Sequence, residues 1–278
     1  MSEKPQNIDP RPAFIGRHPL IAFFLLAYFI SWVSYFAFSG PAMFPFGSII
    51  AAIVVAVLAF GRAGLKDLLS RCVRWRVGVW WYMAAIAVPV AIGFGAVYLN
   101  AAFGAAMPPA FSGAWYEALL LLPLAIIDAP LWEDAGWRGF AVPRFPARRS
   151  RLLNTFILGV LLAGWHLPIA LSAGAVAVPY VITTILSAFV TNWIYYNSRQ
   201  SALLAIIYHG AANAVGIAFF QAFTGTDQLH LYWFLAAMNL LAVLVIVSAN
   251  TKWWLAPDNP PQDPTTALAL FVTIDKQL

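Results

Sequence analysis

Long apolar stretches constrain this chain more than any other feature of its sequence. A helix needs about 20 mostly apolar residues to cross the hydrocarbon core of a bilayer. Only 10% of the residues are charged, whereas a soluble domain carries about 25%. Eight segments are long and apolar enough to cross, at residues 18–38, 44–61, 79–99, 115–133, 152–172, 178–197, 201–221 and 231–250. The sequence therefore predicts an all-α, polytopic membrane bundle of about eight transmembrane helices.

The positions of the basic residues indicate the orientation of these helices. Lys and Arg in short loops are retained on the cytoplasmic side of a membrane. With the N-terminus inside, all 16 Lys and Arg residues fall in cytoplasmic segments, and an odd number of spans would break this segregation. We therefore expect both termini in the cytoplasm and a location in a bacterial cytoplasmic (inner) membrane. The net charge of +5 then reflects topology, so the expected partner is membrane lipid and not nucleic acid.

Three regions follow from this topology. Residues 1–17 form a cytoplasmic N-terminal segment, residues 18–250 form the bundle, and residues 251–278 form a cytoplasmic tail that contains several prolines. Within the bundle, residues 115–221 hold the candidate functional core. Apolar residues recur at helical spacing between basic residues at 62–76, a pattern that predicts an amphipathic helix on the inner leaflet.

Several side chains inside the predicted spans are of types that a bilayer penalises. An ionisable group there costs a few kcal/mol and usually faces a cavity or a partner. Any one such residue is explained equally well as a link between helices, but a combination of them favours a functional site. The candidates, with one amide side chain a turn beyond the last of them, are Asp128, Glu133, Asp134, His166, His209 and Asn213.

Two adjacent carboxylates end the fourth predicted span. Neighbouring side chains on a helix differ by about 100° in direction, so Glu133 and Asp134 cannot both face one reaction centre. One acts directly and the other supports it. Arg138 lies four residues beyond Asp134, within reach of a carboxylate if the helix continues. The pair supplies a candidate general base in a site of restricted water.

Two histidines lie in the later spans. His166 precedes Pro168, which leaves a carbonyl of the previous turn without its helical partner, so the helix should bend at the histidine. His209 and Asn213 stand at i and i+4 on one helical face and can donate hydrogen bonds to one oxygen atom. Straight helices would leave Glu133 and His166 at different depths. We therefore expect bent helices and a cavity that faces the cytoplasm.

These elements together resemble the CPBP family of intramembrane proteases, which includes CAAX prenyl endopeptidases and bacterial proteins linked to bacteriocin processing and self-immunity. The family pattern is Glu-Glu-x-x-x-Arg, Phe-x-x-x-His and His-x-x-x-Asn on successive helices. Residues 128–216 match its order and spacing with Glu133, Asp134 and Arg138, with Leu162 and His166, and with His209 and Asn213. Two residues depart from the pattern, because Asp134 replaces the second Glu and Leu162 replaces the Phe.

The resemblance implies hydrolysis of a peptide bond in a peptide or protein substrate, which is prenylated in the eukaryotic and archaeal relatives. Glu133 would activate water with help from His166, while His209 and Asn213 would stabilise the oxyanion. The alternative is a zinc ion held by Glu133, His166 and His209, since two imidazoles and one carboxylate are the ligands of several catalytic zinc sites. We favour the mechanism without a cofactor, because Asn213 is a poor zinc ligand but a good oxyanion donor.

Two further functions are compatible with the sequence. Buried carboxylates and histidines can relay protons in a transporter, but a transporter would more often show two related halves, and we find none. A catalytically silent relative, acting as an immunity or scaffold protein, is the other alternative, because Asp134 departs from the family pattern.

Overall fold

The computed structural model describes residues 13–37, 44–108 and 117–258. These residues form helices joined by short turns, and no β-strand occurs among them. The predicted all-α fold class is therefore confirmed. The elements are α1 (Ala13–Arg17), α2 (Pro19–Ala37), α3 (Gly47–Cys72), α4 (Val79–Ala102), α6 (Glu117–Asp128), α7 (Pro130–Gly136), η1 (Trp137–Ala141), η2 (Val142–Arg144), α8 (Arg151–Trp165), α9 (Leu167–Ser172), η3 (Gly174–Val176), α10 (Ala177–Asn197), α11 (Ala202–Phe219), η4 (Phe220–Ala222), α12 (Gly225–Ala249) and α13 (Thr251–Leu255).

Six helices in the described residues are long and apolar enough to cross a membrane. They are α2, α3, α4, α10, α11 and α12, with short turns adjoining α10 and α11. The two other predicted spans are each divided into two helices. Residues 115–133 are broken at Ala129, between α6 and α7, and residues 152–172 are broken at His166, between α8 and α9. The total of eight crossings and the cytoplasmic position of the termini stay predictions.

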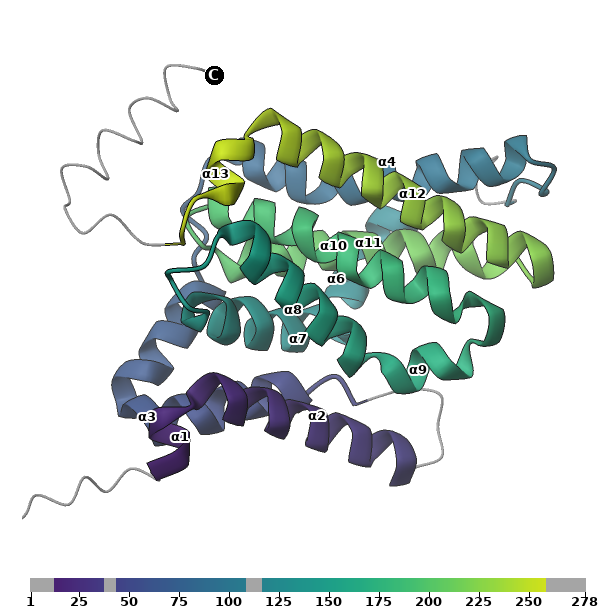
Figure 1. The fold of residues 1–278 in the computed structure, drawn as a ribbon. Helices are drawn as coiled ribbons and strands as arrows, with labels where there is room; N and C mark the ends of the chain where they lie inside the picture. Colours follow the sequence, from purple (N-terminus) through teal and green to yellow (C-terminus); the bar gives the residue numbers. More distant parts are fainter. Residues whose placement is uncertain (1–12, 38–43, 109–116, 259–278) are drawn as a thin grey trace, which may run out of the picture.

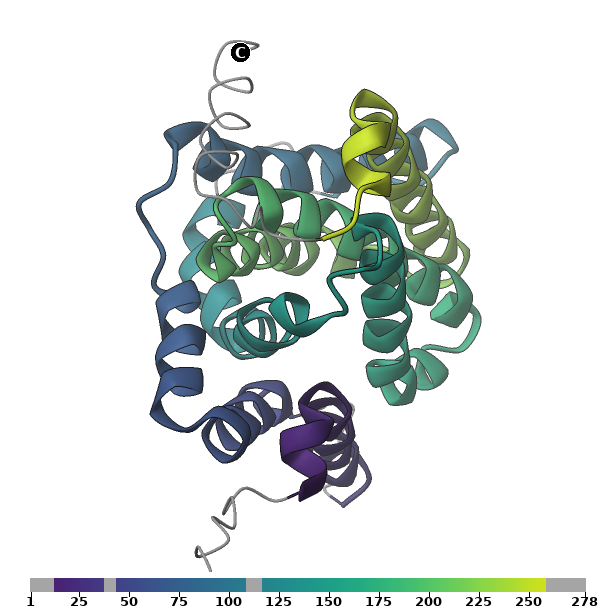
Figure 2. The same ribbon diagram turned by 60° about the vertical axis from the view of Figure 1, so that its left-hand side comes forward.

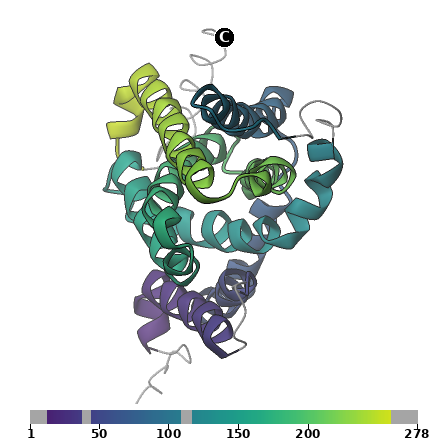
Figure 3. The same cartoon turned by 90° about the vertical axis from the view of Figure 1, so that its right-hand side faces the viewer.

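The long helices run side by side and form a layered bundle (Figure 1). α2 and α3 pack on each other in one outer layer, and α4 and α12 pack on each other in the opposite outer layer (Figure 2). α6, α7, α8, α10 and α11 lie between these layers, as the end-on view shows (Figure 3). α11 contacts α4, α6, α7 and α10, so it is the central helix on which the others pack.

The outer surface of the bundle is apolar. On α2, Leu25 and Phe29 are 63% and 65% exposed, and on α12, Leu244 is 58% exposed. A soluble protein rarely exposes a continuous apolar surface of this kind, whereas a surface that faces lipid requires one. Together with the six long apolar helices, this surface shows an integral membrane protein.

Basic segments gather at one end of the bundle, which we call the basic end. α1, the second part of α3, the turn before α8, the α10–α11 turn and α13 all lie there, on the left in Figure 1. Arg199 Nη1 donates to the Arg76 carbonyl at 3.2 Å, and Arg144 Nη2 lies 3.3 Å from Asp67 Oδ2. The first and last described helices share this end, as an even number of crossings predicts. Arg138 is an exception to the predicted segregation, because it is only 4% exposed and lies inside the bundle.

α3 bends sharply at Gly61, whose φ of 62° and ψ of −149° favour glycine. The part after the bend, residues 62–72, turns across the basic end (Figure 2). Leu68 on this part is fully buried, whereas Leu69 and Val73 are 50% and 66% exposed. The predicted separate helix is confirmed, and one of its faces packs on the protein. Contact of the other face with the inner leaflet stays a prediction.

The first part of the predicted C-terminal tail packs on the bundle. Trp254 in α13 is fully buried, and the Trp253 carbonyl accepts a hydrogen bond from Arg151 Nη1 at 3.0 Å. Asp258 accepts from the Tyr196 hydroxyl at 2.9 Å and pairs with Arg151 at 3.5 Å. Residues 259–278 of the tail, and residues 1–12 of the N-terminal segment, lie outside the described residues.

Candidate active site

A cavity of about 480 Å³ lies between α4, α7, α8, α10, α11 and α12. Most of the residues that line it carry polar or charged side chains, although the outer surface of the bundle is apolar. Polar and ionisable groups inside a membrane bundle mark the place where a function is carried out. Six of the seven candidates named from the sequence line this cavity, namely Asp128, Glu133, Arg138, His166, His209 and Asn213.

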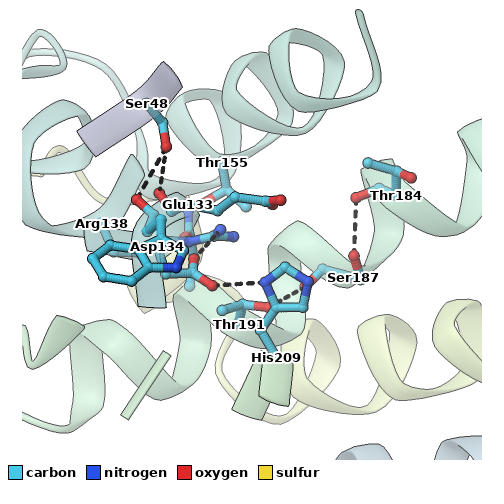
Figure 4. A network of polar contacts seen from close by, with 11 residues as sticks. Ser48, Glu133, Asp134, Arg138, Thr155, Thr184, Ser187, Thr191 and His209 are labelled. Carbon is cyan, nitrogen blue, oxygen red and sulfur yellow. Dashed lines mark hydrogen bonds and ion pairs between the residues drawn. The ribbon is translucent and has the colours of Figure 1, made fainter. Parts of the chain in front are cut away.

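The seventh candidate, Asp134, lies behind the cavity wall and is fully buried. One oxygen, Oδ1, is 2.5 Å from Arg138 Nη1, and the other, Oδ2, is 2.9 Å from His209 Nδ1 (Figure 4). Arg138 Nε also donates to Asn192 Oδ1 at 3.1 Å, and the Asn192 amide donates to Thr155 Oγ1 at 3.1 Å. This network joins α7, η1, α8, α10 and α11, so it fixes the helices that carry the motif residues.

The contact with Asp134 determines how the His209 ring is presented. An ionised carboxylate only accepts hydrogen bonds, so the proton shared with Asp134 resides on His209 Nδ1. The other ring nitrogen, Nε2, is turned away from Asp134 toward α10 (Figure 4). A carboxylate that holds one nitrogen of an imidazole fixes both its tautomer and its orientation. His209 is thereby held with Nε2 available to a ligand in the cavity.

Glu133, unlike Asp134, faces the cavity. It is 6% exposed, and its carboxylate makes no hydrogen bond to another residue of the described chain. The backbone around it is held from α3, because Ser48 Oγ donates to the Trp132 carbonyl at 3.1 Å and approaches the Glu133 carbonyl at 3.4 Å. Glu133 therefore faces the cavity, whereas Asp134 holds Arg138 and His209. The roles predicted for the two carboxylates stay predictions.

Local backbone features explain how α7 comes to lie here. Ala129 has the non-helical angles φ −135° and ψ −48°, and Pro130 then starts α7 at a position where a missing N–H costs nothing. At the other end of α7, a Cβ on Gly136 would lie 2.7 Å from the Ser48 backbone. Glycine at this position therefore allows α7 and α3 to touch.

A π-helical turn, η1, follows α7 directly and carries Arg138. Such turns are uncommon and frequently occur at functional sites. A Cβ on Gly139 would lie 2.9 Å from Leu68 Cδ1 of the bent part of α3. The π-helical turn therefore packs between the bundle and the part of α3 after Gly61.

The predicted bend at His166 is present, because α8 ends at Trp165 and α9 begins at Leu167. His166 Nδ1 lies 2.9 Å from the Leu162 carbonyl of its own helix. A carbonyl only accepts, so Nδ1 carries the proton and Nε2 is an unprotonated acceptor. His166 also lines the cavity, so it can offer a proton acceptor to a molecule bound there.

Two residues of α2 support this bend, and sequence reasoning missed both. Trp32 Nε1 donates to the Trp165 carbonyl at 2.9 Å, and the Tyr28 hydroxyl donates to the Leu161 carbonyl. The Trp165 carbonyl lies at the end of α8, directly before the break at His166, and the Leu161 carbonyl lies one turn earlier. The signal in the sequence was a Trp and a Tyr four residues apart in an apolar span, since such side chains usually find a hydrogen-bond partner when buried.

The zinc alternative requires three donors that converge on one point. Among the described residues, no group of three or more His, Cys, Asp or Glu side chains is placed to hold a metal ion. Glu133, His166 and His209 line one cavity without forming such a group. The zinc alternative stays a prediction, and we derive no step through a metal.

We expected a cavity that opens toward the cytoplasm, but the cavity extends toward the end of the bundle opposite the basic end. Arg138 lies at its inner limit, whereas Phe220 and Gln221, in the turn between α11 and α12, line it at the end opposite the basic end. The bent helices that we expected are present, but the space they enclose extends away from the basic residues.

Comparison with known proteins supports the resemblance carried by the motifs. Residues 113–215 match the family model described as type II CAAX prenyl endopeptidase Rce1-like. The chain is also similar to a protein of Methanococcus maripaludis described as CAAX prenyl protease 2, with 25% identity over 116 residues. The similarity covers 37% of this chain and 43% of the relative, so the chain spans less than half of the length of the curated relative that it matches. All seven candidates named from the sequence lie within residues 113–215.

Proposed function

We propose, from the premise that this chain belongs to the CPBP family through residues 113–215, that it is an intramembrane endopeptidase whose water is activated by Glu133. The observation that carries the proposal is the convergence of Glu133, His166, His209 and Asn213 on one polar cavity. Hydrophobic packing alone does not explain why four polar side chains from three separated motifs line one cavity in an apolar bundle. Peptide hydrolysis assigns a role to each of these four side chains.

In this mechanism the Glu133 carboxylate takes a proton from a water molecule as the water oxygen attacks the carbonyl carbon of the scissile peptide. His166 Nε2 accepts the second hydrogen of that water and aligns it. The carbonyl oxygen becomes an oxyanion. Glu133 then returns its proton to the departing nitrogen, the carbon–nitrogen bond breaks, and the products are a carboxylic acid and an amine.

His209 and Asn213 stabilise the oxyanion by donating hydrogen bonds to it. A neutral imidazole with its proton on Nδ1 has no proton on Nε2, so His209 donates only as the imidazolium. Asp134, 2.9 Å from Nδ1, stabilises that charge. Removal of a single oxyanion donor in a hydrolase costs about 3 to 4 kcal/mol of transition-state stabilisation.

The charges of the site balance in this state. The carboxylates of Glu133 and Asp134 are offset by the Arg138 guanidinium and the His209 imidazolium. Buried charges are tolerated when each is paired and hydrogen-bonded, and three of these four groups are joined by short contacts. Glu133 is the one group free to exchange its proton.

The substrate is a peptide or protein segment at the membrane. The relative from Methanococcus maripaludis is described as a CAAX prenyl protease, so a lipidated peptide is one candidate, and membrane lipid is the expected surrounding of the enzyme. A catalytically silent immunity or scaffold protein and a proton-coupled transporter remain the alternatives against which the proposal is tested.

The test is cleavage of a quenched-fluorescence peptide library by the purified chain in proteoliposomes. Glu133→Gln keeps the size of the side chain and removes the base, and we expect it to lower the rate by about 100-fold or more. Asp227→Asn, the same change of charge outside the cavity, is the matched control and should keep full activity. Both variants should elute and melt as the wild type does.

Other results would favour the alternatives. A wild-type chain that cleaves nothing, with a biological effect that Glu133→Gln retains, supports a silent scaffold. Proton flux into the vesicles that Glu133→Gln abolishes supports a transporter. Cleavage that a chelator removes and zinc restores supports the metal site.

A further inference from the structure

The cavity occupies one half of the bundle, the half away from the basic end. α10 runs toward the basic end and lines the cavity only with residues between 180 and 191 of its range 177–197. α11 runs away from the basic end and contributes residues between 208 and 217 of its range 202–219. α12 starts opposite the basic end and contributes residues between 228 and 239, from its first part. Three independent helices thus place the cavity in the same half.

Toward the basic end the cavity is closed by the network around Arg138. Arg138, Asn192 and Thr155 are 4% exposed or less and bind one another. Beyond this layer, Arg71 Nη1 on the bent part of α3 donates to Gln200 Oε1 at 2.6 Å. Toward the other end the lining continues to the α11–α12 turn, where Gln221 is exposed.

The basic end is the cytoplasmic end if Lys and Arg are retained inside. We propose that the substrate is a peptide segment on the extracytoplasmic side of the membrane, which reaches Glu133 through the mouth at the α11–α12 turn and lies along α10. The proposal rests on the proposed proteolytic function for the identity of what enters. The position of the mouth does not depend on that function.

A row of hydroxyl groups on α10 gives the wall of the cavity a defined chemistry. Thr184, Ser187 and Thr191 each donate to a carbonyl three or four residues earlier, at 2.9, 3.0 and 2.8 Å (Figure 4). Because their protons are used within the helix, their oxygens face a ligand as acceptors.

A row of hydrogen-bond acceptors on the cavity wall can bind a ligand that carries a row of hydrogen-bond donors. An extended peptide presents backbone N–H groups along its length, whereas a prenyl chain presents none. An acceptor left without a partner in a buried site costs free energy that a bound N–H recovers. The wall formed by the α10 hydroxyls therefore favours a peptide backbone over a hydrocarbon chain.

Accessibility of introduced cysteines tests the side of the membrane. The chain has one cysteine, Cys72, so a Cys72→Ser background allows single thiols to be placed at the mouth with Gln221→Cys and at the basic end with Arg148→Cys, both exposed positions. In intact spheroplasts, a membrane-impermeant maleimide should label the first variant and should label the second only after permeabilisation. Labelling of Arg148→Cys from outside, with Gln221→Cys protected, would overturn the proposal.

Peptide cleavage tests two parts of the proposal, namely the route of the substrate past Gln221 and its binding to the hydroxyl groups of α10. A bulky maleimide on Gln221→Cys should abolish cleavage of a peptide that the unlabelled variant cleaves, and the same label on Arg148→Cys should not. Ser187→Ala should raise KM about fivefold, the equivalent of one hydrogen bond of about 1 kcal/mol, with kcat unchanged. Exposed Ser248→Ala is the control. Equal cleavage after blocking Gln221→Cys, or a Ser187→Ala effect on kcat alone, would refute the path along α10.

The labelling experiment and the cleavage experiment together distinguish a failure of this inference from a failure of the proposed function. If the chain cleaves no peptide but the maleimide labels Gln221→Cys from outside, the function is wrong and the outward mouth stands. If the chain cleaves peptides but labelling places the mouth in the cytoplasm, the function stands and this inference is wrong. A preference for prenylated over unmodified peptides would likewise overturn the assignment of the α10 wall.

Discussion

His209 Nδ1 lies 2.9 Å from Asp134 Oδ2, and the two residues are 75 positions apart in the chain. This contact links the carboxylate motif at the end of the α7 region to the histidine motif in α11. Asp134 stands where the CPBP pattern has a second glutamate, and its shorter arm still reaches both Arg138 and His209. The departure from the pattern therefore leaves the supporting hydrogen bonds intact.

The length of the Asp134 side chain is tested by Asp134→Glu, which restores the family pattern. Asp134 is fully buried, so an added methylene must displace Arg138 or His209, at a cost of about 1 to 3 kcal/mol. We expect a lower melting temperature in detergent and slower peptide cleavage. Asp134→Asn, which keeps the size but leaves Arg138 without its counter-charge, should cost about 3 to 5 kcal/mol. A wild-type melting temperature for Asp134→Glu would show that the site has room for the longer arm.

Close contact between α7 and α3 makes Gly136 intolerant of a side chain. A Cβ there would meet the Ser48 backbone at 2.7 Å, a contact that requires the helices to separate. We expect Gly136→Ala to destabilise the protein by about 1 to 3 kcal/mol and to reduce activity through displacement of Glu133. Gly78→Ala, where the nearest atom would be 3.9 Å away, should melt as the wild type does. Equal melting of the two variants would contradict the close contact.

Support of the His166 bend by α2 is tested by Trp32→Phe. This change removes the hydrogen bond to the Trp165 carbonyl and leaves that acceptor unpaired, at a cost of about 1 to 3 kcal/mol. Because His166 follows directly, we expect a lower kcat for peptide cleavage as well as a lower melting temperature. Trp80→Phe, at a position 73% exposed, serves as the control. An effect on stability with no effect on kcat would show that His166 is positioned without α2.

The contact of Asp258 with the bundle gives stability a dependence on pH. Burial raises the pKa of the Asp258 carboxyl above its ordinary value, against the opposing effects of Tyr196 and Arg151. The folded protein therefore binds this proton more tightly than the unfolded chain does. The stability that this group contributes is present below the ordinary Asp pKa and is lost as the pH rises through the raised value.

Asp258→Asn removes this titration. We expect the melting temperature of the wild type to fall relative to that of Asp258→Asn as the pH is raised from below the ordinary Asp pKa to neutrality. Differential scanning calorimetry in detergent across this range measures the difference. Parallel curves for the two proteins would show that Asp258 titrates as an exposed carboxyl does.

Hydropathy predicted the helices of this fold closely, because a bilayer imposes both their length and their composition. The expected span at 79–99 appears as Val79–Ala102, and the span at 178–197 appears as Ala177–Asn197. Hydropathy cannot report where an apolar stretch changes direction. The sequence indicated bent helices and a separate helix from residue 62, but the positions of the break at Ala129 and of the sharp bend at Gly61 appear only in the structure. The bend at His166 was predicted from the proline that follows it.

Ionisable residues of the site stood out because a membrane interior penalises them. Neutral polar residues carry no such signal. Asn192 and Ser48, which bind motif residues, were missed, and so was Thr155, which binds Asn192. The π-helical turn around Arg138, in which Gly139 lies against Leu68, was also not predicted. The orientation of the cavity along the bundle also depends on three helices at once, which no single segment encodes.

The buried layer formed by Asp134, Arg138, Asn192 and Thr155 has an electrical consequence. Moving one elementary charge across 100 mV involves about 2.3 kcal/mol, so a water-filled space that crossed the whole bilayer would dissipate an ion gradient. The cavity stops at Arg138, so a voltage applied across the bilayer would fall across the buried layer between this arginine and the basic end. A membrane protein with a cavity of this kind stays insulating only while that layer stays closed to water.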